Sequence, residues 1–311
     1  MAVQKRKKSV PVIAFLSSQA SKPFKDAAAA FHEGLAHGGC TEGEHFNVEH
    51  QCADGSPDRL KKMAADVVRQ QVALIAAFGG AGTALRAKEQ TDKIPILFVS
   101  GFNPVKVKLL DKLDKGRRPS NITGVHVRTT ELCSDRLKLL RELLPKAKTL
   151  AVLVNPTGVV HEDETAVLGK AARAARLKLV VLQAKDKSEL DAEFKRCKKE
   201  GAEGLVVSAD PFFTSSRDQI VALAARHKIP VVYPWSEYVY AGGLLSYGPN
   251  LTNAYRRVGV YAAMILKGAK PADLPVLEPS SYKLVINLKT ARKLDFEVPH
   301  MLVARANEVV N

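Results

Sequence analysis

The stretch that decides the fold is GGLLSYGPNLTNAYRRVGVYAAMILKG, residues 242–268. It predicts a short apolar strand at 244–247, a turn at Gly248-Pro249 and a helix that stops at Gly268. Apolar residues of the helix recur at i, i+3, i+4 and i+7, which indicates one buried face: Val258, Tyr261, Ala262 and Ile265. A run of strands and helices has ended before this stretch, and one more strand and helix follow it. It therefore predicts a return of the chain to a lobe that is already complete.

Alternating strands and helices fill the rest of the chain. Near-continuous apolar strands such as 10–16 are typical of a parallel sheet that is covered on both faces, with right-handed crossovers. The expected strands form two groups of similar rhythm: 10–16, 46–50, 72–78, 94–99 and 122–127, then 149–154, 177–183, 204–207 and 229–233, with 282–287 after the return. The alternation predicts an α/β protein with two doubly wound lobes.

The return sets the expected domain division. The N-terminal lobe is predicted to hold residues 1–125 plus about 248–275, and the C-terminal lobe 126–247 plus about 276–311. Several crossings would join the lobes at a hinge, and a ligand cleft is expected between them.

The composition is that of an ordinary globular protein. The 311 residues favour two domains, and 46% apolar with 25% charged residues is a typical balance. No window approaches the 18 or so apolar residues of a transmembrane helix. The net charge of +15 is spread along helices, as at Arg136, Lys138 and Arg141, often beside acids. We interpret these residues as solvated helix faces, and we expect no nucleic-acid partner.

Candidate site residues follow the expected strands, because ligands of open α/β sheets collect beyond the carboxyl ends of strands. Hydroxyl, amide and aromatic groups at these ends suit a small organic molecule held by hydrogen bonds and stacking. The candidate ligand-binding residues are Ser17, Ser18, Gln19, Phe78, Gly79, Gly80, Phe102, Asn155, Asp210, Phe212 and Trp235, with Tyr247 within possible reach from the return strand.

Three of these positions have competing structural interpretations. Asp210 could receive the ammonium or hydroxyl of a ligand, or it could cap a helix. Trp235, the only tryptophan, could line the site or pack in the core. Gly79-Gly80-Ala81-Gly82 could bind a carboxylate at a helix N-terminus or could simply form a tight turn.

Catalytic and metal motifs are not found. The glycine run lacks the spacing of a dinucleotide fingerprint and the Gly-Lys-Ser/Thr of a phosphate loop. None of the eight histidines lies in an HExxH pair or beside a GxSxG elbow. Acids at 162–164 complement a helix dipole, and the four cysteines form no CxxC pair. We therefore expect no catalytic residue, metal or cofactor, and buried free thiols.

The return stretch continues to 275 as GGLLSYGPNLTNAYRRVGVYAAMILKGAKPADLP, and YKLVINLKTARKL follows at 282–294. Together they resemble the C-terminal part of ABC-transporter substrate-binding proteins of the tryptophan/tyrosine type. The resemblance extends upstream through PVIAFLSS, SNITGV, LLPKAKTLAVLVNP and KIPVVYP, and so covers nearly the whole chain. It implies two flavodoxin-like lobes of the type I periplasmic-binding-protein fold, no catalytic activity, and delivery of a small solute to a permease in the inner membrane.

The resemblance also implies positions that line the ligand: Ser17, Ser18, Phe78, Gly79, Gly80, Phe102, Asn155, Asp210 and Trp235. Two segments that contain some of these positions depart from the family pattern. Phe78-Gly79-Gly80 stands where amino-acid binders carry a Thr-Pro-Ala-like turn, and Pro234-Trp235-Ser236 stands where they place an acid. The expected solute is thus an amino acid, an aromatic acid or a related compound, with or without a full amino-acid head.

The expected protein is a monomeric, periplasmic solute-binding component of an ABC importer that closes about its hinge. The charged start MAVQKRKKS is followed by a strand pattern, so an export signal is not visible. One alternative is the ligand-sensing domain of a regulator, which would need a helix-turn-helix before the first strand. Another is an α/β enzyme, which would need a nucleophile or phosphate loop.

Overall fold

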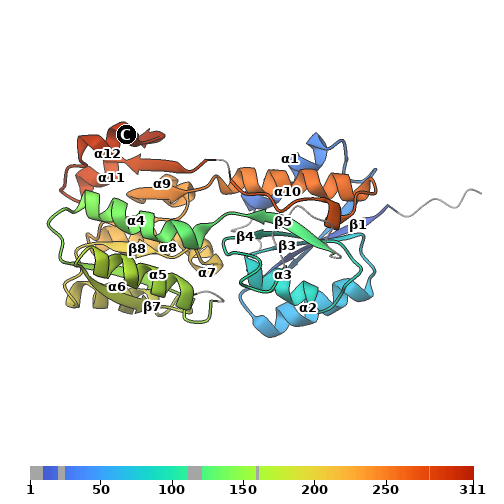
Figure 1. Ribbon diagram of the computed structural model, residues 1–311, viewed down its shortest axis with the longest axis horizontal. Helices are drawn as coiled ribbons and strands as arrows, with labels where there is room; N and C mark the ends of the chain where they lie inside the picture. The colour runs from blue at the N-terminus through green and yellow to red at the C-terminus, as the bar shows by residue number, and fades with distance from the viewer. Residues whose placement is uncertain (1–9, 20–24, 111–120, 159–160, 280) are drawn as a thin grey trace, which may run out of the picture. The chain divides into compact units, whose positions relative to one another are not determined.

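The computed structural model describes residues 10–19, 25–110, 121–158, 161–279 and 281–311 (Figure 1). The charged start MAVQKRKKS, residues 1–9, lies outside these ranges. The chain forms two compact units. Unit 1 comprises Met1–Val99, Lys108–Val125 and Thr252–Leu277, and unit 2 comprises Ser100–Val107, His126–Leu251 and Glu278–Asn311.

Unit 1 is built on a five-stranded sheet in the order β2-β1-β3-β4-β5. Its strands are β1 (Val12–Ser17), β2 (Asn47–Cys52), β3 (Leu74–Phe78), β4 (Ile96–Ser100) and β5 (Ile122–His126), the last residues of β4 and β5 belonging to unit 2. Its helices are α1 (Lys25–His37), α2 (Pro57–Arg69), α3 (Ala81–Lys88) and α10 (Leu251–Leu266). β3 and β4 are buried along their whole length, as their unbroken apolar sequence predicts.

Unit 2 is built on a seven-stranded sheet in the order β12-β11-β10-β9-β8-β6-β7. Its strands are β6 (Thr149–Val154), β7 (Lys178–Gln183), β8 (Leu205–Val207), β9 (Val231–Tyr233), β10 (Leu245–Gly248), β11 (Lys283–Asn287) and β12 (Glu308–Val310). Its helices are α4 (Thr129–Leu143), α5 (His161–Ala174), α6 (Leu190–Lys199), α7 (Pro211–Ser215), α8 (Arg217–Arg226), α9 (Ser236–Tyr240), α11 (Leu288–Lys293) and α12 (His300–Arg305).

The expectation of wholly parallel sheets needs one correction, because β10 and β11 pair antiparallel. The reason lies in the chain path. β10 ends at Gly248, the chain then runs through α10 in unit 1, and it begins β11 at Lys283, the residue that pairs with Gly248. A strand that starts beside the end of its neighbour must run in the opposite direction.

Two further differences concern short elements. The five-residue α7, which follows Asp210 and meets α8 at Ser216, was not predicted. The five-residue α9, the six-residue α12 and the three-residue β12 were not predicted. Such short segments complete too few turns or alternations to show a period in the sequence.

Helix α10 packs against α1 through glycine. A methyl group on Gly34 of α1 would collide with the carbonyl oxygen of Arg256, and one on Gly259 of α10 would collide with the carbonyl oxygen of Phe31. The two backbones can therefore approach only because both positions lack a side chain. Arg256 also donates to Glu33 at 2.7 and 3.0 Å. The late helix of the return stretch is thus part of unit 1.

We predict that Gly259→Ala destabilises the protein, although alanine alone favours a helix by about 1 kcal/mol. The added methyl has no room and must separate α1 from α10, for which overpacking costs of about 1–3 kcal/mol are usual. Urea unfolding would measure the loss. Gly169→Ala in α5 is the matched control, because its methyl would meet only the Arg173 Nη1 atom at 3.6 Å, and it should leave stability unchanged or improved. Equal midpoints for Gly259→Ala and the wild type would contradict the packing argument.

Candidate functional site

In unit 1, the ends of the neighbouring strands β1 and β3 bring Ser18 and Gly79 together. The Ser18 hydroxyl donates to the Gly79 carbonyl oxygen at 3.0 Å. Gly79 and Gly80 have φ of +86° and +93°, and a Cβ on Gly79 would lie 2.5 Å from Ser18 Oγ. Both glycines are therefore required by a tight turn, which leads directly into α3. The interpretation of this glycine run as a tight turn is confirmed. The turn leaves open the binding of a carboxylate by the backbone amides.

The side chains of Ser17 and Phe78 point into the core of unit 1. Ser17 is fully buried, and its hydroxyl accepts from the Gln19 N–H at 3.1 Å. Phe78 is fully buried too, with its ring 4.7 Å from those of Phe15 and Tyr255. The groups left at the strand ends are Ser18, Gln19 and the backbone of the glycine turn. A role for Phe78 in binding stays a prediction that would involve its backbone.

In unit 2, Asn155 and Asp210 follow the adjacent strands β6 and β8 and contact each other. Asn155 Nδ2 donates to Asp210 Oδ1 at 3.1 Å, while Asn155 Oδ1 accepts from the Thr157 N–H and hydroxyl at 3.0 and 2.8 Å. Asp210 Oδ1 also accepts from the Phe212 N–H at 2.8 Å, so the predicted capping role at α7 is confirmed. Both side chains are thus fixed in position at the carboxyl edge of the sheet.

The ionisation of Asp210 reflects two opposing effects. Burial raises the pKa of its carboxyl group above the ordinary value, while hydrogen bonds from Asn155 and from the backbone of Phe212 and Phe213 lower it. Each donor favours the charged form. This is the arrangement of a partly buried carboxylate that can receive an ammonium or hydroxyl group.

The predicted aromatic residues of unit 2 differ in exposure. Phe212 is half-buried, with its ring 5.2 Å from that of the fully buried Phe213. Trp235, only 6% exposed, precedes α9 and packs in the core, which supports its interpretation as a core residue. Phe102, 7% exposed, has its N–H bonded to the Ser100 hydroxyl and lines a separate cavity of about 100 Å³. Phe212 is therefore the partly exposed aromatic residue among these, and its backbone N–H contacts Asp210.

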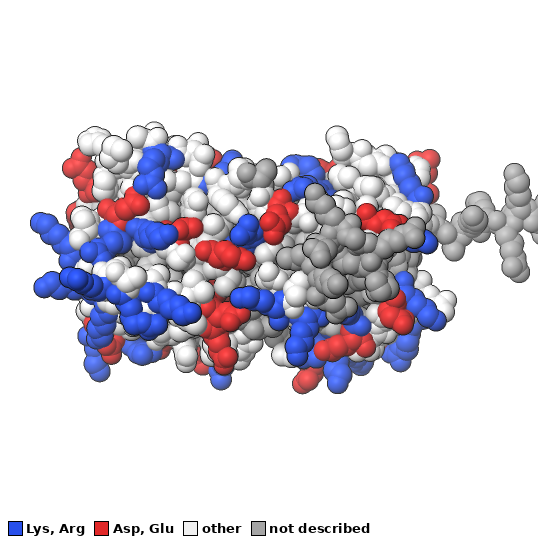
Figure 2. All heavy atoms as spheres, viewed as in Figure 1, with Lys and Arg blue, Asp and Glu red and all other residues white. Residues whose placement is uncertain are grey.

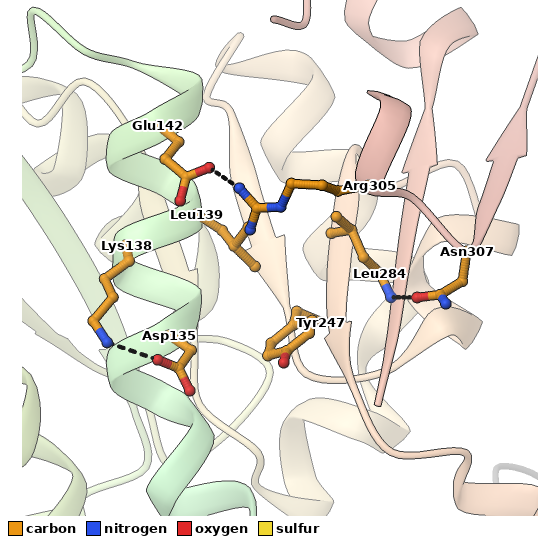
Figure 3. Close-up of a pocket in the computed structure, with 8 residues that line it drawn as sticks. All are labelled: Asp135, Lys138, Leu139, Glu142, Tyr247, Leu284, Arg305 and Asn307. Carbon is orange, nitrogen blue, oxygen red and sulfur yellow. Dashed lines mark hydrogen bonds and ion pairs between the residues drawn. The ribbon is translucent and has the colours of Figure 1, made fainter. Parts of the chain in front are cut away.

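Tyr247 lies apart from this pair. It lines a groove of about 360 Å³ with residues of α4, β11 and the segment before β12 (Figure 3). Its backbone carbonyl oxygen accepts from Arg136 Nε at 3.0 Å. The structure therefore joins Asn155, Asp210 and Phe212 by direct contacts, and it shows no contact of Tyr247 with them among the described residues.

Two charged residues that the sequence analysis did not select lie buried near Asp210. Arg136 was interpreted as part of a solvated helix face, and this is wrong, because its side chain is fully buried. Its Nη2 donates to the Thr129 carbonyl oxygen at 3.2 Å. Glu164 on α5, only 2% exposed, faces Arg136, Ser208 and Asp210. The sequence did indicate that Arg136 is buried, because this residue falls on the apolar stripe of Leu132, Leu137 and Leu140.

Burial is the largest influence on the Glu164 carboxyl and, with a smaller contribution from the Asp210 charge, raises its pKa to about 7 against the lowering effect of Arg136. The folded protein thus favours the neutral carboxyl, so its stability falls as pH rises from about 4.5 to about 7. We predict that Glu164→Gln removes this decline and that its advantage over the wild type grows across the window. At about 1.4 kcal/mol per pKa unit, the advantage reaches at most about 3 kcal/mol.

Urea unfolding at pH 5, 6, 7 and 8 would test this prediction. Glu162→Gln is the matched control, because Glu162 is exposed on the same helix and its removal should not alter the slope of stability against pH. Parallel stability curves for the wild type and Glu164→Gln would show that Glu164 has an ordinary pKa.

The described residues contain no group of three or more His, Cys, Asp or Glu side chains that could hold a metal ion. They also contain no helix that is long and apolar enough to span a membrane. All four cysteines are free; three are buried and Cys52 is partly exposed. Within this part of the chain, the Asn155–Asp210 pair is a polar arrangement at a strand edge in which both side chains are held by several hydrogen bonds.

Residues 9–310 match the family model of ABC transporter substrate binding proteins. The chain belongs to this family. The resemblance stated from the return stretch is confirmed, and members of the family bind a small molecule outside the cytoplasm and work with a permease. This substrate-binding protein is also 25% identical over 272 residues to a tyrosine-binding protein of Clostridioides difficile, an alignment that covers 87% of this chain and 77% of the relative.

Solved structures of similar proteins confirm the predicted fold class. A conserved domain protein from Vibrio cholerae has a TM-score of 0.88 and 24% identity, covering 96% of this chain and 99% of its own. An ABC domain in complex with L-Trp from Streptococcus pneumonia has a TM-score of 0.83 and 22% identity, covering 96% and 100%. A ligand-free, open substrate-binding protein from Clostridium difficile has a TM-score of 0.68 and 24% identity, covering 97% and 99%.

Proposed function

We propose that this protein binds an aromatic amino acid or a related aromatic acid in the periplasm and presents it to an ABC permease of the inner membrane. The observation that carries the proposal is the Asn155–Asp210 pair, in which Asp210 also accepts from the backbone N–H of the half-buried Phe212. The names of two similar proteins add support, since one is a tyrosine-binding protein and the other was solved with L-Trp.

Each strand-end group has a role that follows from its chemistry. The Asp210 carboxylate receives the ammonium group, and Asn155 fixes its orientation. Phe212 offers a ring face on which an aromatic side chain can stack. In unit 1, Ser18 and the amides at the start of α3 can donate to a carboxylate, because helix N-termini favour anions.

Transport requires binding without turnover. The solute is released unchanged, and its contacts favour the conformation that the permease recognises. The protein acts as a monomer, without a cofactor and without a nucleic-acid partner. On the face shown in Figure 2, lysine and arginine side chains gather most densely on the left and have acidic side chains among them elsewhere. We interpret them as solvated helix surfaces.

We predict that L-tyrosine or L-tryptophan raises the melting temperature of the wild type. A ligand at a hundred times its dissociation constant adds about 2.7 kcal/mol of stability. Asp210→Asn should lose at least tenfold in affinity, because the neutral amide cannot pair with an ammonium group. Asp218→Asn is the matched control, since Asp218 is exposed on α8 and should not affect binding.

Mass spectrometry of the ligand recovered from the protein completes this test. Recovery of an altered compound would contradict transport without turnover. The absence of any melting shift across the amino acids and aromatic acids would overturn the proposed solute class, and unchanged affinity in Asp210→Asn would remove Asp210 from the site.

A further inference from the structure

The groove that contains Tyr247 lies wholly within unit 2 and has a volume of about 360 Å³ (Figure 3). One wall is α4, the other is the chain from Arg305 to Asn307, and the floor comes from β10 and β11. None of its lining residues belongs to the Asn155–Asp210 arrangement. Its volume is within the range of pockets that hold small organic molecules.

The floor of the groove is apolar. Tyr247 and Leu284 are cross-strand partners on β10 and β11, so their side chains lie side by side on one face of the sheet. Leu139 from α4 adjoins them, and both leucines are 4% exposed. Tyr247 is half-buried, which leaves part of its ring open to the groove. This floor suits an apolar or aromatic group.

The two walls differ in the polar groups that they offer. The wall of α4 carries the carboxylates of Asp135 and Glu142. The opposite wall carries donors, because Asn307 uses its Oδ1 to accept from the Leu284 N–H at 2.8 Å and retains its NH₂ group. Arg305 donates from Nη1 to Glu142 at 2.6 Å, and one such bond leaves most of the guanidinium donors for other acceptors. The groove is therefore polarised across its width.

We propose that this groove is a second binding site, which accepts a free α-amino acid with an apolar or aromatic side chain. The ligand carboxylate bonds to Arg305 and Asn307, and the ammonium group pairs with Asp135. The side chain lies over Tyr247, Leu139 and Leu284. Because one wall carries carboxylates and the other carries donors, each charge of a zwitterion lies beside a group of opposite character.

A zwitterion fits better than an ion of either sign. Asp135 and Glu142 repel a simple anion, and Lys138, which donates to Asp135 at 2.9 Å, together with Arg305 repels a simple cation. Burial, followed by the charge of Asp135, raises the pKa of Tyr247, which shows that this carboxylate acts on the floor of the groove. The lining ion pairs are partly exposed and contribute little each, so we expect a dissociation constant on the order of 1 mM.

Methyl NMR of the full chain tests the proposal, with Leu139 and Leu284 as reporters and L-tryptophan as the probe. The Asp210→Asn background weakens the proposed transport site at least tenfold, and Leu139 and Leu284 line the groove, so a titration of their signals there reports on the groove. We expect both leucine signals to shift with one dissociation constant. Tryptamine, which lacks the carboxylate, and indole-3-propionate, which lacks the ammonium group, should each bind at least tenfold more weakly than L-tryptophan.

Two variants in the Asp210→Asn background should change the affinity of the groove for L-tryptophan in opposite directions. Arg305→Ala should weaken binding at least tenfold, whereas Glu142→Gln should strengthen it severalfold, because it releases Arg305 from its ion pair. Lys289→Ala on the exposed surface of α11 is the control and should change nothing. A purely structural ion pair would instead make Arg305→Ala and Glu142→Gln behave alike.

The outcomes separate the two sites. Failure of the wild type to bind any aromatic amino acid tightly would overturn the proposed transport function and leave the groove to be judged by the leucine signals. The absence of leucine shifts at 10 mM L-tryptophan, or equal binding of tryptamine, indole-3-propionate and L-tryptophan, would overturn the second site.

Discussion

The buried guanidinium of Arg136 is the constraint on which unit 2 depends. A buried charge is tolerated only when it is hydrogen-bonded or paired. Arg136 donates to the carbonyl oxygens of Tyr247 and Thr129, and it lies within electrostatic reach of Glu164. These contacts fix the end of β10, the start of α4 and the buried face of α5 relative to one another. The groove floor at Tyr247 therefore depends on this arrangement.

Asp210 and Glu164 are two buried carboxyl groups that differ in the donors around them. Both lose solvation on folding, which raises both pKa values. Asp210 is compensated by donors from Asn155 and the α7 backbone, which favour its ionised form. The Oε1 atom of Glu164 has no hydrogen-bond partner among the described residues, and burial raises the pKa of this carboxyl to about 7. This division makes Asp210 the better partner for a cationic group.

The sequence predicted what unbroken apolar runs and strand ends reveal. β6 has the predicted bounds, 149–154, and the strand-end rule selected Asn155 and Asp210, which contact each other. The buried state of Arg136 was missed because its neighbours Lys138 and Arg141 suggested a solvated face, whereas only the helical stripe places it inward. The groove at Tyr247 could not be predicted, because it needs the antiparallel register of β10 with β11 and the position of Arg305.

The return stretch contributes to both units, and its two ends are held by different forces. Its strand, β10, is fixed in unit 2 by the bond from Arg136 to Tyr247. Its helix, α10, is fixed in unit 1 by close backbone packing at Gly34 and Gly259. Beyond the helix, the Thr123 hydroxyl donates to the carbonyl oxygen of Leu274, which holds the following segment beside β5. The first unit is therefore completed only after most of the second has been synthesised, so neither sheet with its covering helices can be assigned to one continuous half of the chain.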